Sequence, residues 1–414
     1  MFKWFRELDR DGRRTFWACY GGYALDAMDV QIYSFILPVL VLAWGMSNTE
    51  AGLVATVTLV LSAVGGWIAG VMSDRIGRVL TLQITIAWFA TFTFLCGLTT
   101  SFEGLLVTRG LQGLGFGGEW AAGSVLIGEV VAARHRGKAV GFVQSSWAVG
   151  WGAAAVLATL FLTFLPEAYA WRALFFVGLL PALAVFFVRR YVPEPAVYVN
   201  AKARPSIGAI FSPRFRSVTA RGCLLAVGAH GGFYAITTWL PAFLRQERQL
   251  SILSTGTYLA VIIVGSLVGY LVSAYLNDGV GRRKTFLVFA FGSLAIVLTY
   301  TQIPVSNEMM LVLGFPLGFF ASGIFSGMGP LFTELFPTEL RGSGQGFCYN
   351  SGRGLAAFFP AVVGLASAYI PLGQAIGLFA SGAYGLVIVA AFMLPETKGR
   401  ELESLALAKV EPVP

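Results

Sequence analysis

Residues 70–78 read GVMSDRIGR, and residues 274–284 read AYLNDGVGRRK. Each stretch follows a long apolar run, and both have the spacing Asp-x-x-Gly-Arg, which begins at Asp74 in the first and at Asp278 in the second. One charged loop of this kind is most often a solvated turn that ends a membrane span. Its recurrence at a matched place indicates a chain with an internal repeat.

A second motif is also present twice. The sequences GEVVAARHRGKAVGF and TELFPTELRGSGQGF each place a glutamate seven residues before an arginine, as Glu129 and Arg136 in the first and Glu334 and Arg341 in the second. Both motifs repeat at a shift of about 205 residues. Internal repeats are a common basis of transporter folds. We therefore predict a unit of six helices that is duplicated, with a central path between the two copies.

The composition places these helices in a lipid bilayer. Of 414 residues, 56% are hydrophobic and only 12% are charged, which is too apolar for an ordinary soluble protein. A hydrocarbon core of about 30 Å requires about 20 apolar residues of helix. Twelve such spans are predicted, at residues 16–44, 51–73, 80–98, 103–128, 138–164, 171–190, 219–241, 254–276, 285–303, 308–333, 343–369 and 372–394.

The predicted fold is an all-α membrane protein of twelve transmembrane helices in two pseudo-symmetric six-helix bundles. Residues 1–190 form the first bundle, residues 191–218 a cytoplasmic linker, and residues 219–414 the second bundle with a short cytoplasmic tail. The first span is too long for the apolar part of a cleaved signal peptide and contains acidic residues.

The distribution of Lys and Arg predicts the orientation of the chain. The tails, the linker and the loops on their side of the membrane carry most of the 29 basic residues, whereas the other side receives only Arg172, Arg245 and Arg248. The positive-inside rule therefore places both termini in the cytoplasm. The net charge of +8 follows from this topology, so no nucleic-acid partner is expected.

Several motifs resemble those of one transporter family. The two Asp-x-x-Gly-Arg loops resemble the loop motif of the major facilitator superfamily, although Val79 stands where a second basic residue is usual and Ala274 where the second copy would begin with glycine. The ends VPEPAVY and LPETKGRELESL resemble those of sugar and organic-acid porters. The stretches LDAMDVQIYSFILP, GEWAAGSVLIGEVV and YNSGRGLAAFFP resemble the sialate and monocarboxylate (lactate-type) proton symporters, with aromatic-acid symporters as near relatives.

This resemblance covers essentially the whole chain. It implies alternating access in a prokaryotic inner membrane, a small organic acid and a proton as the transported species, and first-helix acids that take part in coupling. The repeated loops would then form a cytoplasmic gate, in which acids accept hydrogen bonds from helix N-termini and arginines pair with glutamates. The predicted gate residues are Asp74, Arg78, Glu129, Arg136, Asp278, Arg282, Glu334 and Arg341.

Two aspartates lie inside the first predicted span, in the stretch GGYALDAMDVQIYSFILPVLVLAW at residues 21–44. A charge at mid-bilayer costs about 2.5–3.5 kcal/mol on insertion scales, which favours a functional interpretation. Asp26 and Asp29 are three residues apart and share a helix face. Burial and like charge favour a protonated carboxyl, so the pair is a candidate proton carrier. Alternatively, both acids only pair with a basic residue and hold helices together.

The fourth predicted span contains a third carboxyl. Glu119 shares a helix stripe with Arg109 and Gln112, and we predict it as a second proton site. The alternative is an ion pair with an arginine from another helix, a structural role that we also assign to Arg109. The glycine-rich stretch GLGFGG lies inside this helix with no strand before it, so it indicates close helix packing and not a phosphate loop.

The eleventh predicted span contains Arg353, about ten residues from its cytoplasmic end. An arginine stays charged and offers a planar fork that suits a carboxylate. Its counterpart in the first half is Ala148, so the charge breaks the symmetry of the repeat, as a substrate site does. We predict that Arg353 binds the substrate anion, with Tyr349 and Asn350 beside it. The alternative is a permanent salt bridge to one of the three buried acids.

Other polar and aromatic residues are candidates for the cavity wall. Gln144 and Trp147 lie on one face of the fifth span, and His230 and Tyr234 on one stripe of the seventh. Each has an alternative role in helix packing. An aromatic lining with one arginine would suit a small acid that has an apolar part.

We predict proton-coupled uptake of a lactate-like monocarboxylate by a monomeric carrier. Rival cargoes on the same fold are aromatic acids, sialic acid, sugars and exported drugs. An enzyme or receptor is disfavoured because the sequence has no nucleophile motif or Walker loop, and a channel because the repeat suits alternating access. No metal or cofactor is expected, since the four cysteines lack metal or redox spacing. These cysteines are Cys19, Cys96, Cys223 and Cys348.

Overall fold

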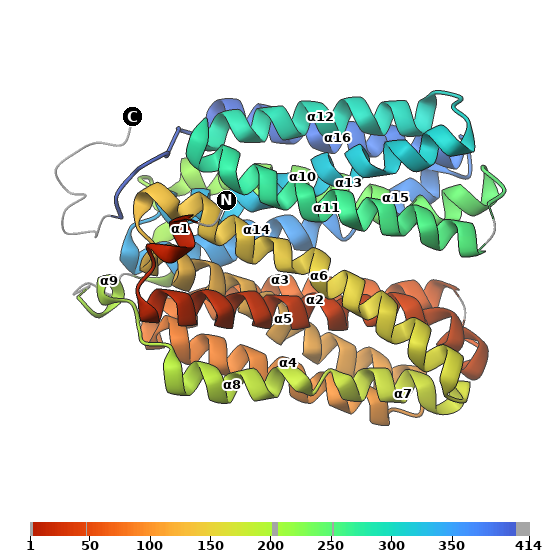
Figure 1. The fold of residues 1–414 in the computed structure, drawn as a ribbon, viewed down its shortest axis with the longest axis horizontal. Helices are drawn as coiled ribbons and strands as arrows, with labels where there is room; N and C mark the ends of the chain where they lie inside the picture. The colour runs from red at the N-terminus through yellow and green to blue at the C-terminus, as the bar shows by residue number, and fades with distance from the viewer. Residues whose placement is uncertain (1–2, 47, 201–205, 251, 403–414) are drawn as a thin grey trace.

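The computed structural model describes residues 3–46, 48–200, 206–250 and 252–402, which form helices joined by short turns (Figure 1). No strand is present in these ranges. The first half contains α1 (Lys3–Arg6), α2 (Arg10–Trp44), α3 (Asn48–Ile76), α4 (Arg78–Leu98), α5 (Phe102–Val130), η1 (Ala133–His135), α6 (Arg136–Phe164), α7 (Glu167–Val177) and α8 (Leu180–Tyr191). The linker contains α9 (Ala196–Val199) and η2 (Ile207–Phe211). The second half contains α10 (Arg216–Gln246), α11 (Ile252–Gly279), α12 (Arg282–Gln302), α13 (Asn307–Leu335), η3 (Thr338–Leu340), α14 (Arg341–Ala356), α15 (Phe359–Ala366) and α16 (Leu372–Met393).

Ten of the twelve predicted spans correspond to one helix each, and two are divided. The sixth predicted span is divided between α7 and α8, and the eleventh between α14 and α15. A proline stands at the start of both α8 and α15. Proline has no N–H group for the bond to the preceding turn, which favours an interruption at these two places.

Among the described residues, eight helical segments are long and apolar enough to cross a membrane by length and composition. They begin at Gly52, Arg78, Ala133, Arg216, Gly256, Arg282, Asn307 and Leu372. α5 is not one of them, since its polar residues, Arg109, Gln112 and Glu119, lower the mean hydropathy of its centre. These polar side chains lie inside the protein.

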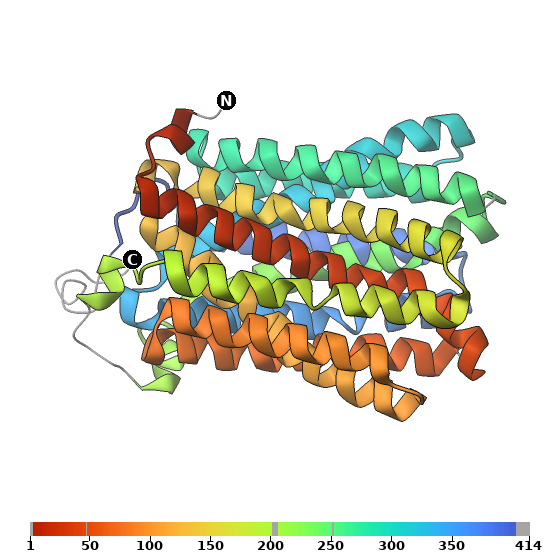
Figure 2. The ribbon, with the colours of Figure 1, turned by 60° about the horizontal axis from the view of Figure 1, so that its bottom comes forward.

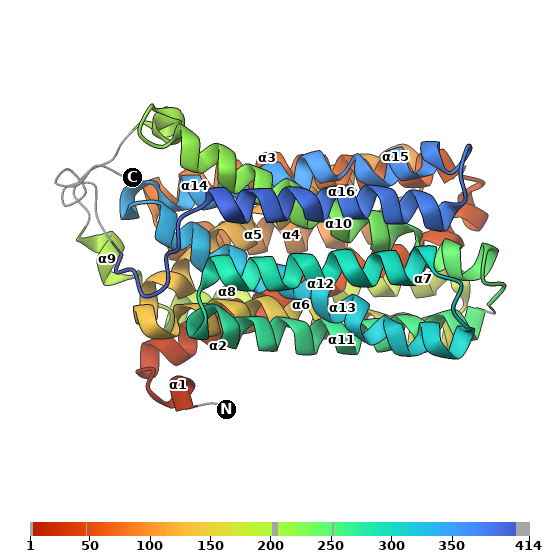
Figure 3. The same ribbon diagram turned by 90° about the horizontal axis from the view of Figure 1, so that it is seen from above.

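The two halves lie side by side along the long axis of the molecule (Figure 1). α3 packs along α14 and α6 packs along α11, and α5 and α13 also contact the opposite half. α2 and α8 pack against each other within the first half (Figure 2). On the other side of the molecule, α11, α12 and α16 cover the second half (Figure 3).

The halves approach closely where glycine faces glycine. A Cβ atom added at Gly346 of α14 would lie 2.6 Å from the carbonyl oxygen of Gly66 of α3, which leaves no space for a side chain. Small residues permit this backbone contact between membrane helices.

α1, the linker helices α9 and η2, and residues 394–402 all lie at one end of the bundle, on the left in Figure 1. The loops with both repeated motifs are also there. We call it the basic end, because these loops carry many of the Lys and Arg residues.

Candidate functional site

The predicted gate residues lie together at the basic end. Glu129 accepts hydrogen bonds from Nε and Nη2 of Arg78, at 3.0 Å each, within its own half. Its Oε1 also accepts one from Nη1 of Arg341 in the second half, at 2.5 Å. All three side chains are fully buried, so one glutamate holds an arginine from each half.

The second copy of the motif forms the same arrangement. Glu334 accepts hydrogen bonds from Nε and Nη2 of Arg282, at 3.1 and 2.7 Å, within its own half. Arg136 of the first half donates to the same carboxylate at 3.0 Å. The two ion-pair clusters therefore have the same arrangement. In each one, a glutamate pairs with one arginine of its own half and one arginine of the opposite half.

The two aspartates cap helices of the opposite half. Asp74 accepts hydrogen bonds from the backbone N–H groups of Gly342 and Ser343, at 2.9 and 2.7 Å. Asp278 accepts them from Gly137 and Lys138, at 2.9 Å each. A carboxylate at a helix N-terminus is stabilised by the helix dipole and satisfies free N–H groups.

Each loop depends on a glycine. Gly77 and Gly281 both have φ of 108°, a region closed to other residues, and they precede α4 and α12. The structure thus brings all eight predicted gate residues into contacts at the basic end. Their action as a gate stays a prediction.

A small cavity lies midway along the interface of the two halves. Its volume is about 20 Å³, enough for about one water molecule. Six predicted substrate residues line it, from α6, α10 and α14. They are Gln144, Trp147, His230, Tyr234, Tyr349 and Arg353.

Arg353 is held in this wall by aromatic rings. Its guanidinium carbon lies 4.2 Å from the ring centre of Phe116 and 5.2 Å from that of Tyr349. Only 2% of the residue is exposed. Neither Nε nor Nη1 has a hydrogen-bond partner, and no carboxylate of a described residue lies within ion-pair distance. The permanent salt bridge considered from the sequence is therefore not present.

The remaining lining residues are also positioned by aromatic contacts. The His230 ring lies 4.8 Å from Tyr349, and its Nδ1 atom is 2.9 Å from the carbonyl oxygen of Ala226. Gln144 donates a hydrogen bond to the Tyr23 hydroxyl at 3.2 Å, whereas its Oε1 atom has no partner. Buried polar atoms without partners are available to a ligand.

Asn350 does not line the cavity. Its amide donates to the carbonyl oxygen of Gly346 at 3.0 Å and to that of Gly117 at 3.5 Å. It points toward the contact between α14 and the first half, so its place is between packed helices.

The three acids differ in their surroundings. Asp29 lies 3.6 Å from Nη1 of Arg109 and accepts a hydrogen bond from Gln112, which is the structural pairing considered from the sequence. Asp26 is fully buried, and neither of its oxygens has a hydrogen-bond partner among the described residues. The charged groups that act on Asp26 are Glu119, Arg353 and Asp29.

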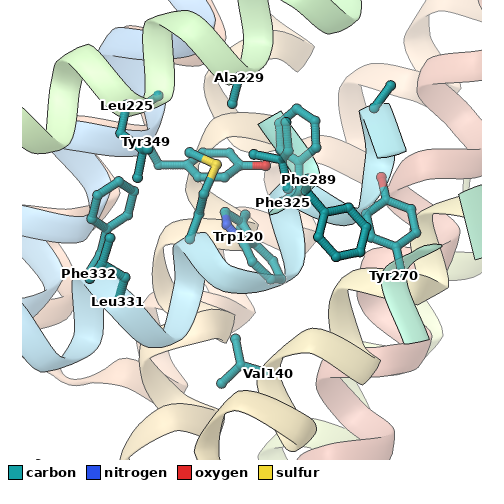
Figure 4. Close-up of a cluster of buried hydrophobic side chains, with 14 of the residues drawn as sticks. Trp120, Val140, Leu225, Ala229, Tyr270, Phe289, Phe325, Leu331, Phe332 and Tyr349 are labelled. Carbon is teal, nitrogen blue, oxygen red and sulfur yellow. The ribbon is translucent and has the colours of Figure 1, made fainter. Parts of the chain in front are cut away.

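Four cavity residues were not predicted: Tyr23, Phe233, Tyr270 and Phe325. Tyr23 could have been found, because it precedes Asp26 by three residues and shares its helix face. Figure 4 shows Tyr270, Phe325 and Tyr349 gathered beside Trp120, which belongs to the other half. Nothing in the apolar sequence around Phe325 distinguishes it from packing residues.

The sequence profile described as "Major Facilitator Superfamily" matches residues 19–300 and 260–413. The chain belongs to the Major Facilitator Superfamily. The fold class and the family resemblance predicted from the repeated loops are thereby confirmed, and this facilitator is a membrane transporter and not an enzyme.

Relatives align with this facilitator over most of their length. It is 42% identical to a probable 4-methylmuconolactone transporter of Cupriavidus pinatubonensis, over 99% of this chain and 96% of that protein. It is 31% identical to the cis,cis-muconate transport protein of Acinetobacter baylyi, over 86% of each. It is 29% identical to the sialic acid transporter NanX of Escherichia coli, over 89% of this chain and 91% of that protein.

The fold is similar to that of a solved facilitator. The proton:xylose symporter XylE superposes with a TM-score of 0.80 at 18% identity, over 96% of this chain and 99% of that one. This likeness concerns the arrangement of the two halves.

Proposed function

We propose that this facilitator takes up a small organic monocarboxylate together with a proton, by alternating access, across the inner membrane. The basic end would face the cytoplasm, as the distribution of Lys and Arg predicts. Lactate represents the simplest cargo of this class. The carrier would act as a monomer.

The observation that carries this proposal is that Arg353 forms no ion pair with a described residue, and that its Nε and Nη1 atoms have no hydrogen-bond partner. A buried charge without an ion-pair partner is costly, whereas a bound carboxylate supplies both an opposite charge and hydrogen-bond acceptors. Nε and Nη1 lie on different edges of the guanidinium, and each is free to donate a hydrogen bond to a bound carboxylate. A bound monocarboxylate would neutralise Arg353 at the interface of the halves, where alternating access can expose it to either side.

The coupling part of the proposal rests on Asp26 and Glu119. Among the described residues, Asp26 has no hydrogen bond that would stabilise its ionised form. Glu119 is a second acidic group that acts on it electrostatically. We assign proton binding to these two acids, with Asp29 orienting the site through Arg109. One anion moved with one proton transfers no net charge, whereas uncompensated anion entry would work against about 2.3 kcal/mol per 100 mV.

The aromatic wall favours a second candidate cargo, an aromatic or unsaturated carboxylic acid. Tyr23, Trp147, Tyr234 and Tyr349 present rings to the cavity that also contains Arg353. Flat rings stack well on such surfaces. Relatives named for cis,cis-muconate and sialic acid transport support an organic acid in general.

Uptake by purified protein in proteoliposomes tests both candidates. Radiolabelled lactate and benzoate, one for each candidate, are offered with an inward proton gradient while the membrane potential is clamped at zero. We expect gradient-driven uptake of at least one acid, lost in Arg353→Ala and reduced in the matched Arg353→Lys, which keeps the charge without the fork. Uptake that persists in Arg353→Ala, or that follows the potential at fixed pH, would contradict the proposal.

A further inference from the structure

A groove at the basic end is separate from the central cavity. It lies between the start of α2 and the end of α8, and its volume is about 450 Å³. Its lining includes Asp9, Arg10, Arg13, Arg14, Trp17 and Phe187. Three arginines and two exposed aromatic side chains therefore share one concave surface.

The groove is at the depth of lipid headgroups. Trp17 is 56% exposed and Phe187 is 39% exposed, on the outer side of the first half. Exposed Trp residues such as Trp17 are typical of the level where hydrocarbon meets headgroups. α2 extends from the first arginines, Arg10 to Arg14, into the apolar part of the first predicted span, so these cations lie just outside the hydrocarbon core.

The arginines are held at the groove but retain free donors. Arg14 lies over the Tyr191 ring, with its guanidinium carbon 5.0 Å from the ring centre. Arg13 donates to the carbonyl oxygen of Arg6 at 2.7 Å. Arg10 forms no hydrogen bond or ion pair with any residue that the structure describes.

Nearby carboxylates do not neutralise this cluster. The Oδ1 atom of Asp9 accepts a hydrogen bond from the N–H group of Gly12 at 2.6 Å. Asp11 lies 3.4 Å from Arg14, in a pair whose side chains are 52% and 27% exposed, and such solvated pairs are weak. The groove therefore keeps an excess of positive charge.

We propose that this groove binds the phosphate headgroup of an anionic phospholipid. The arginines would bind the phosphate oxygens, and Trp17 and Phe187 would pack against the start of the acyl chains. Free phosphate has the same oxygens, but it would leave the exposed aromatic side chains without a partner, which favours the lipid. Basic pockets between membrane helices at this level are suited to such headgroups.

Lipid binding is measured by native mass spectrometry on the full-length protein in nanodiscs that contain phosphatidylglycerol and phosphatidylcholine. We expect preferential retention of phosphatidylglycerol. The double variant Arg10→Gln/Arg14→Gln should weaken it on the order of 30-fold, since each arginine near an anionic surface contributes about fivefold. Arg10→Lys/Arg14→Lys keeps the charges and should retain most of the binding.

The matched control is Arg214→Gln/Arg216→Gln, which removes two exposed arginines on the same side but away from the groove. The proposal is overturned if this control weakens binding equally, if the groove variant binds normally, or if soluble glycerol phosphate binds as well as the lipid. Monodisperse elution of each variant confirms folding. None of these readouts depends on transport, so they are independent of the proposed cargo.

Discussion

Replacement of Arg341 by glutamine is expected to loosen the basic end without disrupting either half. Arg341 reaches across the interface to Glu129 at 2.5 Å, and both side chains are fully buried. Glu129 keeps its two hydrogen bonds to Arg78, which belongs to its own half. The change therefore removes a contact that exists only while the halves are together.

The size of the effect follows from the kind of contact that is lost. A hydrogen bond between charged groups contributes about 1.5–3 kcal/mol, which corresponds to about a 10- to 150-fold fall in the ratio of closed to open molecules. The equivalent contact of the second cluster, from Arg136 to Glu334 at 3.0 Å, is unaffected. The closed state should therefore become less populated but remain detectable.

Distances between spin labels at Ile76 and Val280 report this change. Both residues are exposed, and they stand at the basic ends of the two halves. The labels are attached to a background in which the four native cysteines are replaced by serine. We expect a longer-distance population to grow in Arg341→Gln.

The control is Arg134→Gln, which removes an exposed ion pair to Glu7. Such a pair contributes about 0–1 kcal/mol, so the distances should stay unchanged. Identical distance distributions for Arg341→Gln and the parent protein would refute the reasoning, as would an equal shift in the control.

Three further changes test other parts of the structure. Asp26→Asn should abolish the stimulation of uptake by a proton gradient while exchange of internal for external cargo continues; gradient-driven uptake at the parental rate would exclude Asp26 as the proton site. Arg109→Gln leaves Asp29 buried without its cation and should lower stability by about 3 kcal/mol, measured by thermal unfolding, with Asp29→Asn expected to restore most of the loss. Gly77→Ala should cost about 1–3 kcal/mol because φ is 108° there, whereas Gly21→Ala, whose added Cβ meets no atom within 4 Å, should unfold at the parental temperature.

The sequence was sufficient to predict the fold because the features that determine it are local or repeated. Span length follows from apolar runs, and the duplication follows from motifs at matched positions. The interruptions of the sixth and eleventh spans were missed, since a proline among apolar residues is also compatible with a continuous, kinked helix.

The candidate site was only partly predictable. Arg353 stands out because a charge in an apolar span is rare. Asn350 was chosen because it lies one helix turn before Arg353, but its amide is held by the carbonyl oxygens of Gly346 and Gly117. Phe325 reaches the cavity only through the packing of α13, and the sequence of one helix does not show which neighbour its apolar residues will face.

The separation of Arg353 from Asp26 has an electrical consequence for the transport cycle. With cargo bound, the anion would balance the guanidinium and the proton would balance the acid. Without cargo, an ionised Asp26 would balance Arg353 from a distance, because no direct ion pair joins them. The central site would then have no net charge when the carrier changes conformation, whether cargo is bound or not. Neither conformational change would move charge across the membrane potential.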